Sequence, residues 1–284
     1  MYNKFMDYFN IAKKFRAKKR LGQNFLIDES VIDEILSNVN EFDDVFEIGP
    51  GLGFVTQNLI KSAKSVTAVE IDKDAAEILN KNLGQNENFR LIENDILKVN
   101  LDDFYPSGNK VKVVANIPYY ITSPILAHLL GEIDDSKNAN RSHIDEIILM
   151  VQYEVAKRIC ADEKSQNKEY GMLSILSNFY CDCEIIKKVS RRSFYPSPKV
   201  DSALVRIKNN NKPRIENPSP MLKRTIKAAF GTRRKNIKNS LLSAGILGVK
   251  EALEKIGMDI NTRGEKLSLH DFNTLACALE EYNL

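Results

Sequence analysis

The chain has 284 residues, of which 43% are hydrophobic, and a formal net charge of +3. This length predicts about two domains, and no apolar stretch approaches the ~18–20 residues of a membrane span. The N-terminus lacks the apolar core of a signal peptide, so a cytoplasmic protein is expected. The four cysteines form no C-x-x-C pair, so no metal site is expected.

Short strand patterns alternate with helical patterns over the first two thirds of the chain. After a helical segment at 30–39, strands are expected at 45–48, 65–71, 89–93, 110–115, 146–151, 184–189 and 203–208. Helices are expected up to about residue 61 and at 74–82, 123–131, 154–160 and 171–180. Ser123 and Pro124 have the residue types of an N-cap and a first helical position. This alternation predicts a mostly parallel, seven-stranded sheet that is covered on both faces.

A polar, proline-containing stretch at 209–220 has the composition of a linker. Beyond it, helical spacing is found at 221–230, 236–244, 250–256 and 269–281. We therefore expect one domain at 1–210, which includes a basic N-terminal extension at 1–20, and a small all-helical domain at 211–284.

Gly49, Gly51 and Gly53 follow the first strand and precede a helix, a position in which glycines allow a tight turn and close approach to a ligand. Glu70 ends the next strand, where an acid can accept both ribose hydroxyls of a nucleoside. Because the G-x-G-x-G spacing differs from the dinucleotide fingerprint, S-adenosylmethionine fits better than a dinucleotide. Asp95 ends the third strand and is expected to accept from the adenine amine. Two further residues, Ile71 and Ile96, could sandwich the adenine ring.

The tetrapeptide Asn116-Ile117-Pro118-Tyr119 ends the fourth strand, in the same crevice. An amino group on an aromatic ring is a poor nucleophile, because its lone pair is delocalised. The Asn116 side-chain oxygen and the Pro118 carbonyl can accept hydrogen bonds from its two N–H groups and draw the nitrogen toward a tetrahedral shape. Tyr119 offers a flat face for stacking a base.

Basic residues gather in separate parts of this nearly neutral chain, which favours a polyanion-binding surface. Residues 1–20 contain seven Lys/Arg and one acid, and residues 221–250 contain eight and no acid. The residues that we expect to bind RNA are Lys19, Arg20, Arg191, Arg192, Lys199, Arg233, Arg234 and Lys235.

Five segments in order resemble motifs of the rRNA adenine N6-dimethyltransferases, and they span nearly the whole chain. They are 19–26, 47–53, 116–119, 194–203 and the region of Phe230, Arg233–Lys235 and 239–241. The resemblance implies a Rossmann-like class I methyltransferase fold. It also implies cofactor contacts at Asn24, Leu26, Gly49, Glu70, Asp95 and Asn116. Phe194 lies in the segment that closes the substrate side of the pocket, and it is a candidate for the other face of the target base.

By resemblance, S-adenosylmethionine is the cofactor and S-adenosylhomocysteine the product. The implied substrate is a pair of adjacent adenosines in the 3′-terminal hairpin loop of 16S rRNA, within the small ribosomal subunit or its precursor. A loop suits this chemistry, because extruding a partly unstacked base costs only about a few kcal/mol. A monomer without membrane association is expected.

Three alternatives remain. Erythromycin-resistance methyltransferases act on large-subunit rRNA, but their glycine loop usually differs from the Pro50 and Leu52 form found here. A DNA adenine methyltransferase would share the Asn116 chemistry, but it would need an added domain to read duplex sequence. An assembly factor could use the fold for binding alone. One departure from the family pattern is Tyr120, which stands where asparagine is often found.

Overall fold

The computed structural model describes residues 7–135, 138–165, 168–210 and 212–283, apart from the side chains of Tyr119 and Ser165. The chain forms two compact units. Unit 1 comprises Met1–Leu129, Ala139–Ala156 and Glu184–Asn209, and unit 2 comprises Leu130–Asn138, Lys157–Cys183 and Asn210–Leu284. Segments before residue 210 thus belong to both units, and the assignment of functional domains at 1–210 and 211–284 stays a prediction.

The main sheet has seven strands in the order β4-β3-β2-β5-β6-β9-β7. Their bounds are β2 Asp44–Ile48, β3 Ser65–Glu70, β4 Phe89–Glu93, β5 Val111–Asn116, β6 Ile144–Gln152, β7 Cys181–Val189 and β9 Ser202–Asn209. The strands from β4 to β6 are parallel to their neighbours, and β9 is antiparallel to β6. The predicted mostly parallel, seven-stranded sheet is confirmed. Its central strands are almost continuous runs of buried apolar residues, as expected for strands covered on both faces.

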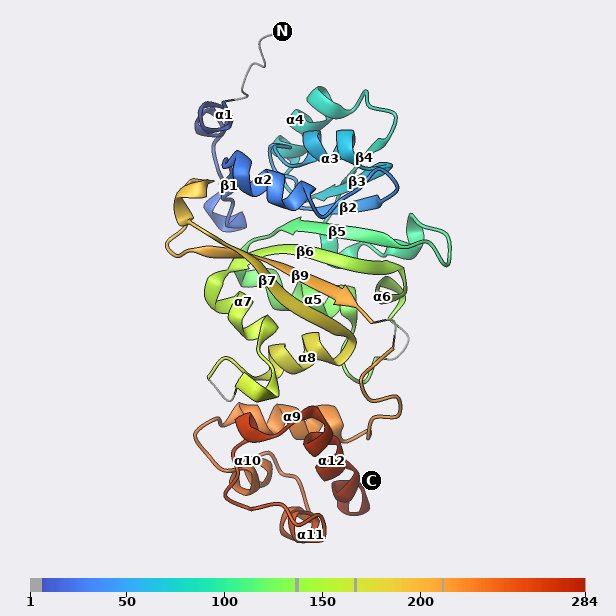
Figure 1. Ribbon diagram of the computed structural model, residues 1–284, viewed down its shortest axis with the longest axis vertical. Helices are drawn as coiled ribbons and strands as arrows, with labels where there is room; N and C mark the ends of the chain where they lie inside the picture. The colour runs from blue at the N-terminus through green and yellow to red at the C-terminus, as the bar shows by residue number, and fades with distance from the viewer. Residues whose placement is uncertain (1–6, 136–137, 166–167, 211, 284) are drawn as a thin grey trace. The chain divides into compact units, whose positions relative to one another are not determined.

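Helices α3 Thr56–Ser62 and α4 Lys73–Leu83 connect β2 to β3 and β3 to β4, and helices α5 Thr122–Leu130 and α6 Ala139–His143 lie between β5 and β6 (Figure 1). Helix α2 Glu29–Leu36 precedes β2, and helix α7 Tyr153–Cys160 follows β6. Asp28 and Asp72 cap α2 and α4 by accepting from backbone N–H groups of the first turn. The predicted capping pair before α5 is wrong: the helix begins at Thr122, directly after the 3₁₀ helix η4 Tyr119–Ile121, so Ser123 lies within it.

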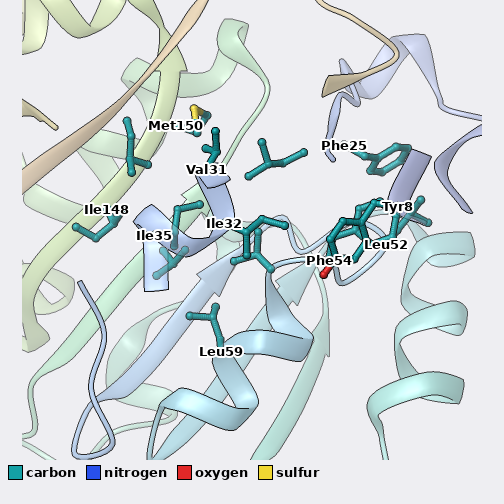
Figure 2. Packing of buried hydrophobic residues seen from close by; sticks show 14 of the residues in the cluster. Tyr8, Phe25, Val31, Ile32, Ile35, Leu52, Phe54, Leu59, Ile148 and Met150 are labelled. Atoms are coloured by element: carbon teal, nitrogen blue, oxygen red, sulfur yellow. The ribbon is translucent and has the colours of Figure 1, made fainter. Parts of the chain in front are cut away.

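The N-terminal segment is built into unit 1, a feature that the helical and strand patterns did not reveal. Helix α1 Tyr8–Lys14 buries Tyr8 and Ala12, and strand β1 Phe25–Leu26 pairs with β8 Phe194–Tyr195 in a second, two-stranded sheet. These residues join one apolar cluster with α2, the glycine loop and β6 (Figure 2). In that cluster the rings of Tyr8 and Phe54 have centroids 4.7 Å apart.

Unit 2 is helical apart from its share of β7. Its helices are α8 Met172–Tyr180, α9 Leu222–Gly231, α10 Ile237–Ser243, α11 Val249–Lys255 and α12 Leu269–Asn283, and each of the four predicted C-terminal helices is found within about two residues of its expected bounds. Phe230 of α9 contacts Tyr170 and Phe272, with ring centroids 6.1 and 5.8 Å apart. Among the residues that the structure describes, no helix is long and apolar enough to span a membrane.

Candidate functional site

A pocket in unit 1 lies at the carboxyl ends of the parallel strands, where open α/β sheets bind ligands. Parallel pairing of β2 with β3 and β5 sets Ile48 opposite Val69 and Ala115, so the loops after these strands meet at one edge. Most of the predicted site residues line this pocket. They are Asn24, Leu26, Gly49, Gly51, Glu70, Ile71, Asp95, Ile96, Asn116 and Pro118.

All three glycines of the loop after β2 have a left-handed backbone conformation, with φ values of +70° at Gly49, +57° at Gly51 and +80° at Gly53. A Cβ atom on Gly51 would also lie 3.0 Å from the Phe25 ring. Gly53 does not line the pocket. A Cβ atom there would lie 2.7 Å from the Leu79 side chain of α4, so this glycine allows α4 to pack closely. The loop therefore brings backbone close to a ligand through its first two glycines.

Glu70 is a buried carboxylate that links the glycine loop to the end of β3. One oxygen accepts from the Gly51 N–H at 2.9 Å and the other from the Asp72 N–H at 2.8 Å. Burial raises the pKa of Glu70, although these backbone hydrogen bonds favour the charged form. A carboxylate can accept about four hydrogen bonds, so both oxygens retain the capacity to accept from a ribose.

Asp95 and its neighbours line the pocket on the side of β4. The Asp95 side chain accepts from the Leu97 N–H at 3.0 Å and so caps the 3₁₀ helix η2 Ile96–Lys98. Capping uses one of its oxygens and leaves acceptor capacity on the carboxylate. Ile71 is 53% exposed and Ile96 only 9%, and both line the pocket.

Asn116 is tied to the N-terminal segment across the pocket. Its side-chain N–H donates to the Asn24 carbonyl at 3.4 Å, which leaves the side-chain oxygen as the acceptor atom. The Pro118 carbonyl accepts from the Ile121 N–H at 3.1 Å and has a second lone pair. The predicted stacking role of Tyr119 falls on a side chain that lies outside the described part of the structure.

The pocket lining is acidic, although the chain as a whole is slightly basic. Glu47, Glu70 and Asp95 line it, and no Lys, Arg or His does so among the described residues. Glu47 is 3% exposed, burial raises its pKa to about 8, and its Oε2 atom has no hydrogen-bond partner within the described chain. A buried carboxyl group with one unpartnered oxygen fits a ligand that brings a positive charge or a donor, as S-adenosylmethionine does.

Sequence reasoning did not single out Glu47 or Asp72. The signal for Glu47 was a carboxylate inside a buried apolar strand, where charged residues are rare. Asp72 accepts from Lys18 and, at 2.6 Å, from the Gln23 side-chain amide. Burial alone would raise the pKa of Asp72, but the hydrogen bonds from Lys18 and Gln23 outweigh it and lower that pKa. Lys18 and Gln23 are separated from Asp72 by 54 and 49 positions in the sequence, so these two contacts could be seen only in the folded structure.

Other predicted residues lie outside the pocket lining. Phe194 is 2% exposed and pairs with Leu26 between β8 and β1, so its role beside the target base stays a prediction. Arg191, Arg192 and Lys199 are exposed in unit 1. Arg191 donates to the Lys199 carbonyl at 3.4 Å.

The basic cluster of unit 2 divides into two kinds of residue. Arg233 donates to the backbone carbonyls of Lys168 and Tyr170, and its guanidinium lies 5.7 Å from the Phe230 ring centroid. Arg234 and Lys235 are exposed, and Lys235 donates to Ser243 at 2.9 Å. All three residues are exposed, but Arg233 also supports the fold of unit 2 through its bonds to backbone carbonyls.

Comparisons with known proteins agree with this architecture. The family model described as "Ribosomal RNA adenine dimethylase" matches residues 14–281. "Ribosomal RNA small subunit methyltransferase A" of Clostridium botulinum (strain Okra / Type B1) is 41% identical over 268 residues, 93% of this chain and 94% of that protein. The protein of the same name from Clostridium perfringens (strain SM101 / Type A) is 40% identical over 278 residues, 94% of this chain and 92% of that protein.

Two solved structures share the fold. The 23S rRNA methyltransferase ErmE has a TM-score of 0.65 and 27% identity, and the match covers 90% of this chain and 100% of that chain. A dimethyladenosine transferase from Plasmodium falciparum has a TM-score of 0.69 at 24% identity, with 87% and 94% covered. Fold and comparisons together define an S-adenosylmethionine-dependent methyltransferase. The chain belongs to the ribosomal RNA adenine dimethylase family, as its motifs predicted.

Proposed function

We propose that this enzyme dimethylates N6 of two adjacent adenosines in the 3′-terminal hairpin loop of 16S rRNA, and that it acts as a monomer on the small subunit or its precursor. The observation that carries the proposal is that Asn116 lines the same pocket as Glu70 and Asp95, with its amide nitrogen bound to Asn24. An acceptor oxygen for an exocyclic amine is thereby brought to a pocket suited to a cationic nucleoside cofactor.

Residues of the pocket would hold S-adenosylmethionine as follows. Glu70 would accept from the ribose hydroxyls, Asp95 from the adenine amine, and Ile71 and Ile96 would contact the adenine ring. When bound, the cofactor supplies an electrophilic methyl group on a sulfonium.

The residues at the end of β5 would prepare the target amine. Asn116 and the Pro118 carbonyl would each accept one N–H of N6 and favour a tetrahedral nitrogen with an available lone pair. Tyr119 would stack against the base, and Phe194 stays a candidate for the opposite face. The methylated nitrogen carries a positive charge and is acidic, so its proton can pass to water without a strong base. Two rounds at each base convert the amine to a dimethylamine.

The small subunit is favoured over the large subunit by sequence similarity. Relatives named for the small subunit are 41% identical to this chain, whereas ErmE is 27% identical at similar coverage. Eight basic, exposed residues would bind phosphates of the RNA: Lys19, Arg20, Arg191, Arg192, Lys199, Arg233, Arg234 and Lys235. A role in small-subunit biogenesis in the cytoplasm follows from such a substrate.

The test supplies labelled S-adenosylmethionine with small subunits, large-subunit precursors and duplex DNA, each lacking the modification. Products are mapped by reverse-transcription stops. Label in two adjacent adenosines of the 16S 3′ hairpin is expected. Label in large-subunit RNA would instead assign the enzyme to the resistance type. Absence of label in all three would favour a factor that acts by binding.

A further inference from the structure

Tyr120 is an exposed aromatic side chain at the mouth of the cofactor pocket. It follows Pro118 by two residues, lines the pocket and is 66% exposed. An exposed tyrosine is ordinary on a protein surface. Tyr120 is unusual because it lines the same pocket as Asn116 and Pro118, the two proposed acceptors of the target amine.

The Tyr120 side chain is held against the N-terminal segment. Its hydroxyl group donates to the Arg20 carbonyl at 3.4 Å. A Cβ atom on Gly22, which has a φ of +58°, would lie 3.4 Å from Tyr120 Cε1 and 3.1 Å from Pro118 Cβ. The ring is therefore fixed at its hydroxyl end and along the side that meets Gly22, while most of the side chain remains open to solvent.

The backbone segment that the Tyr120 hydroxyl contacts carries two cationic residues. Lys19 and Arg20 belong to the 3₁₀ helix η1 Lys19–Leu21, and both are exposed. Neither forms an ion pair with an acid within the described residues. A fixed aromatic ring next to unpaired cations is the combination with which proteins bind single-stranded nucleic acid, because the ring stacks a base and the cations bind its phosphates.

We propose that Tyr120, Lys19 and Arg20 form a second nucleotide subsite at the mouth of the pocket. The base next to the target adenosine stacks on Tyr120, and its phosphate binds Lys19 and Arg20. This inference rests on the proposed function, in which an adenosine enters the pocket and its strand continues outside. It gives Tyr120, the departure from the family pattern, the role of holding the neighbouring nucleotide while one base is methylated.

The experiment compares Tyr120→Ala, Tyr120→Phe and wild-type enzyme on unmethylated small subunits. Loss of stacking should raise the KM for subunits about 5- to 150-fold in Tyr120→Ala. Tyr120→Phe keeps the ring, so its KM for subunits should stay within about three-fold of the wild-type value. The Kd for S-adenosylmethionine, measured by calorimetry, should not change in either variant. Phe42→Ala removes an aromatic ring that is 80% exposed and outside the pocket lining, and it is the matched control.

Three results would overturn the subsite. A KM of Tyr120→Ala within two-fold of wild type would show that no base stacks there. Equal defects in Tyr120→Phe and Tyr120→Ala, with a weakened Kd for the cofactor, would show that the hydroxyl only fastens the N-terminal segment. If Tyr120→Ala fails to fold, the double variant Lys19→Gln, Arg20→Gln is tested instead. The slope of log binding constant for subunits against log salt concentration should become shallower by about one unit or more. An unchanged slope would refute the subsite. Wild-type enzyme that leaves small subunits unlabelled would instead refute the proposed function.

Discussion

The side chain of Glu47 lies in the pocket lining, and burial raises its pKa to about 8. The nearby charge of Glu70 raises that pKa further in the same direction. Glu47 is therefore largely protonated in the folded protein at neutral pH, whereas in the unfolded chain it ionises near its ordinary value of 4.5. Burial in the folded protein thus opposes ionisation of Glu47, whereas a bound cation would favour its ionised form.

The charge of Glu47 should make cofactor affinity depend on pH. Between about pH 7 and 9 Glu47 ionises, so the affinity for cationic S-adenosylmethionine should rise relative to that for S-adenosylhomocysteine, which lacks the sulfonium charge. The ratio of the two affinities should change on the order of ten-fold, which corresponds to a shift of one unit in the pKa of Glu47 when the sulfonium is bound. Calorimetry with both ligands checks this in wild type and in Glu47→Gln, because the sulfonium charge lowers the pKa of the α-amino group in S-adenosylmethionine and both proteins share that effect. The same pH dependence of the ratio in wild type and Glu47→Gln would contradict the assignment.

The same group should also affect stability. Because the folded-state pKa is raised above the unfolded value, the free energy of unfolding that depends on Glu47 falls as pH rises from about 5 to 8. Glu47→Gln cannot ionise, so its melting temperature should rise relative to wild type across that range. Differential scanning calorimetry at pH 5, 6.5 and 8 measures the difference in melting temperature between the variant and wild type. A difference that is the same at all three pH values would argue against a buried, protonated Glu47.

Asn116→Ala removes one proposed acceptor of the target amine. Single-turnover rates at saturating cofactor should fall by roughly 10²- to 10³-fold, the scale for losing one preorganised hydrogen-bonding group. Thermal unfolding serves as the folding control, since the hydrogen bond of this side chain within the described residues is the 3.4 Å contact to the Asn24 carbonyl. A rate within a few-fold of wild type would contradict this role for Asn116.

Single residues differed in how well the sequence revealed them. Glu70, Asp95 and Asn116 could be predicted to share a pocket, because they follow the carboxyl ends of parallel strands in one sheet. Glu47 and Asp72 could not, because burial and long-range hydrogen bonds decide their environment. Gly53 has a positive φ like Gly49 and Gly51, but its packing against Leu79 could be seen only in the structure.

At the scale of elements, the segment between α1 and β1 connects two sides of the cofactor pocket. Lys18 and Gln23 contact Asp72 at the end of β3, while Asn24 and Gly22 contact the residues that follow β5. Asp72 also bonds to Glu70 through its N–H. Glu70, the proposed cofactor contact on β3, and the segment that carries Asn24 are therefore joined by one hydrogen-bond network.

Asp72→Asn should loosen this segment without removing the cap of α4, since asparagine caps helices as well as aspartate does. Losing the charge that Lys18 and Gln23 contact should lower the free energy of unfolding by roughly 1–3 kcal/mol and weaken cofactor binding. Hydrogen–deuterium exchange over residues 18–24 should quicken. Asp74→Asn is the matched control, because Asp74 also pairs with Lys18, at 2.7 Å, but is largely exposed. Equal effects of the two variants would remove the special role of Asp72.

Elements with long apolar periodicity were predictable, and short ones were not. Most strands and helices from residue 44 onward match their predicted ranges closely because burial on both faces, or on one helical face, leaves a clear pattern, but the five-residue helix α6 was not predicted. The two-residue strands β1 and β8 have no periodicity to detect, and they exist because residues 25 and 195 meet in the fold.

At the scale of the whole molecule, basic residues occur in both units, and their roles differ. Arg233 donates to carbonyls of unit 2, whereas Arg234 and Lys235 face solvent. The double variant Arg234→Glu, Lys235→Glu should weaken RNA binding. The slope of log binding constant against log salt concentration should become shallower by about two units. Arg233→Met should mainly lower the melting temperature. Binding titrations at several salt concentrations check both, and an unchanged slope in the double variant would remove these residues from the RNA interface.

The acidic pocket has one more consequence, for ligands that a cell holds in abundance. ATP contains the same adenosine moiety as S-adenosylmethionine, but it carries a polyphosphate. The carboxylates of Glu70 and Asp95 would repel those phosphates, and no cation in the described lining would compensate. The carboxylates that suit a sulfonium thus act as a filter against nucleotides, so that the enzyme can work unhindered among competitors that share the adenosine of its cofactor.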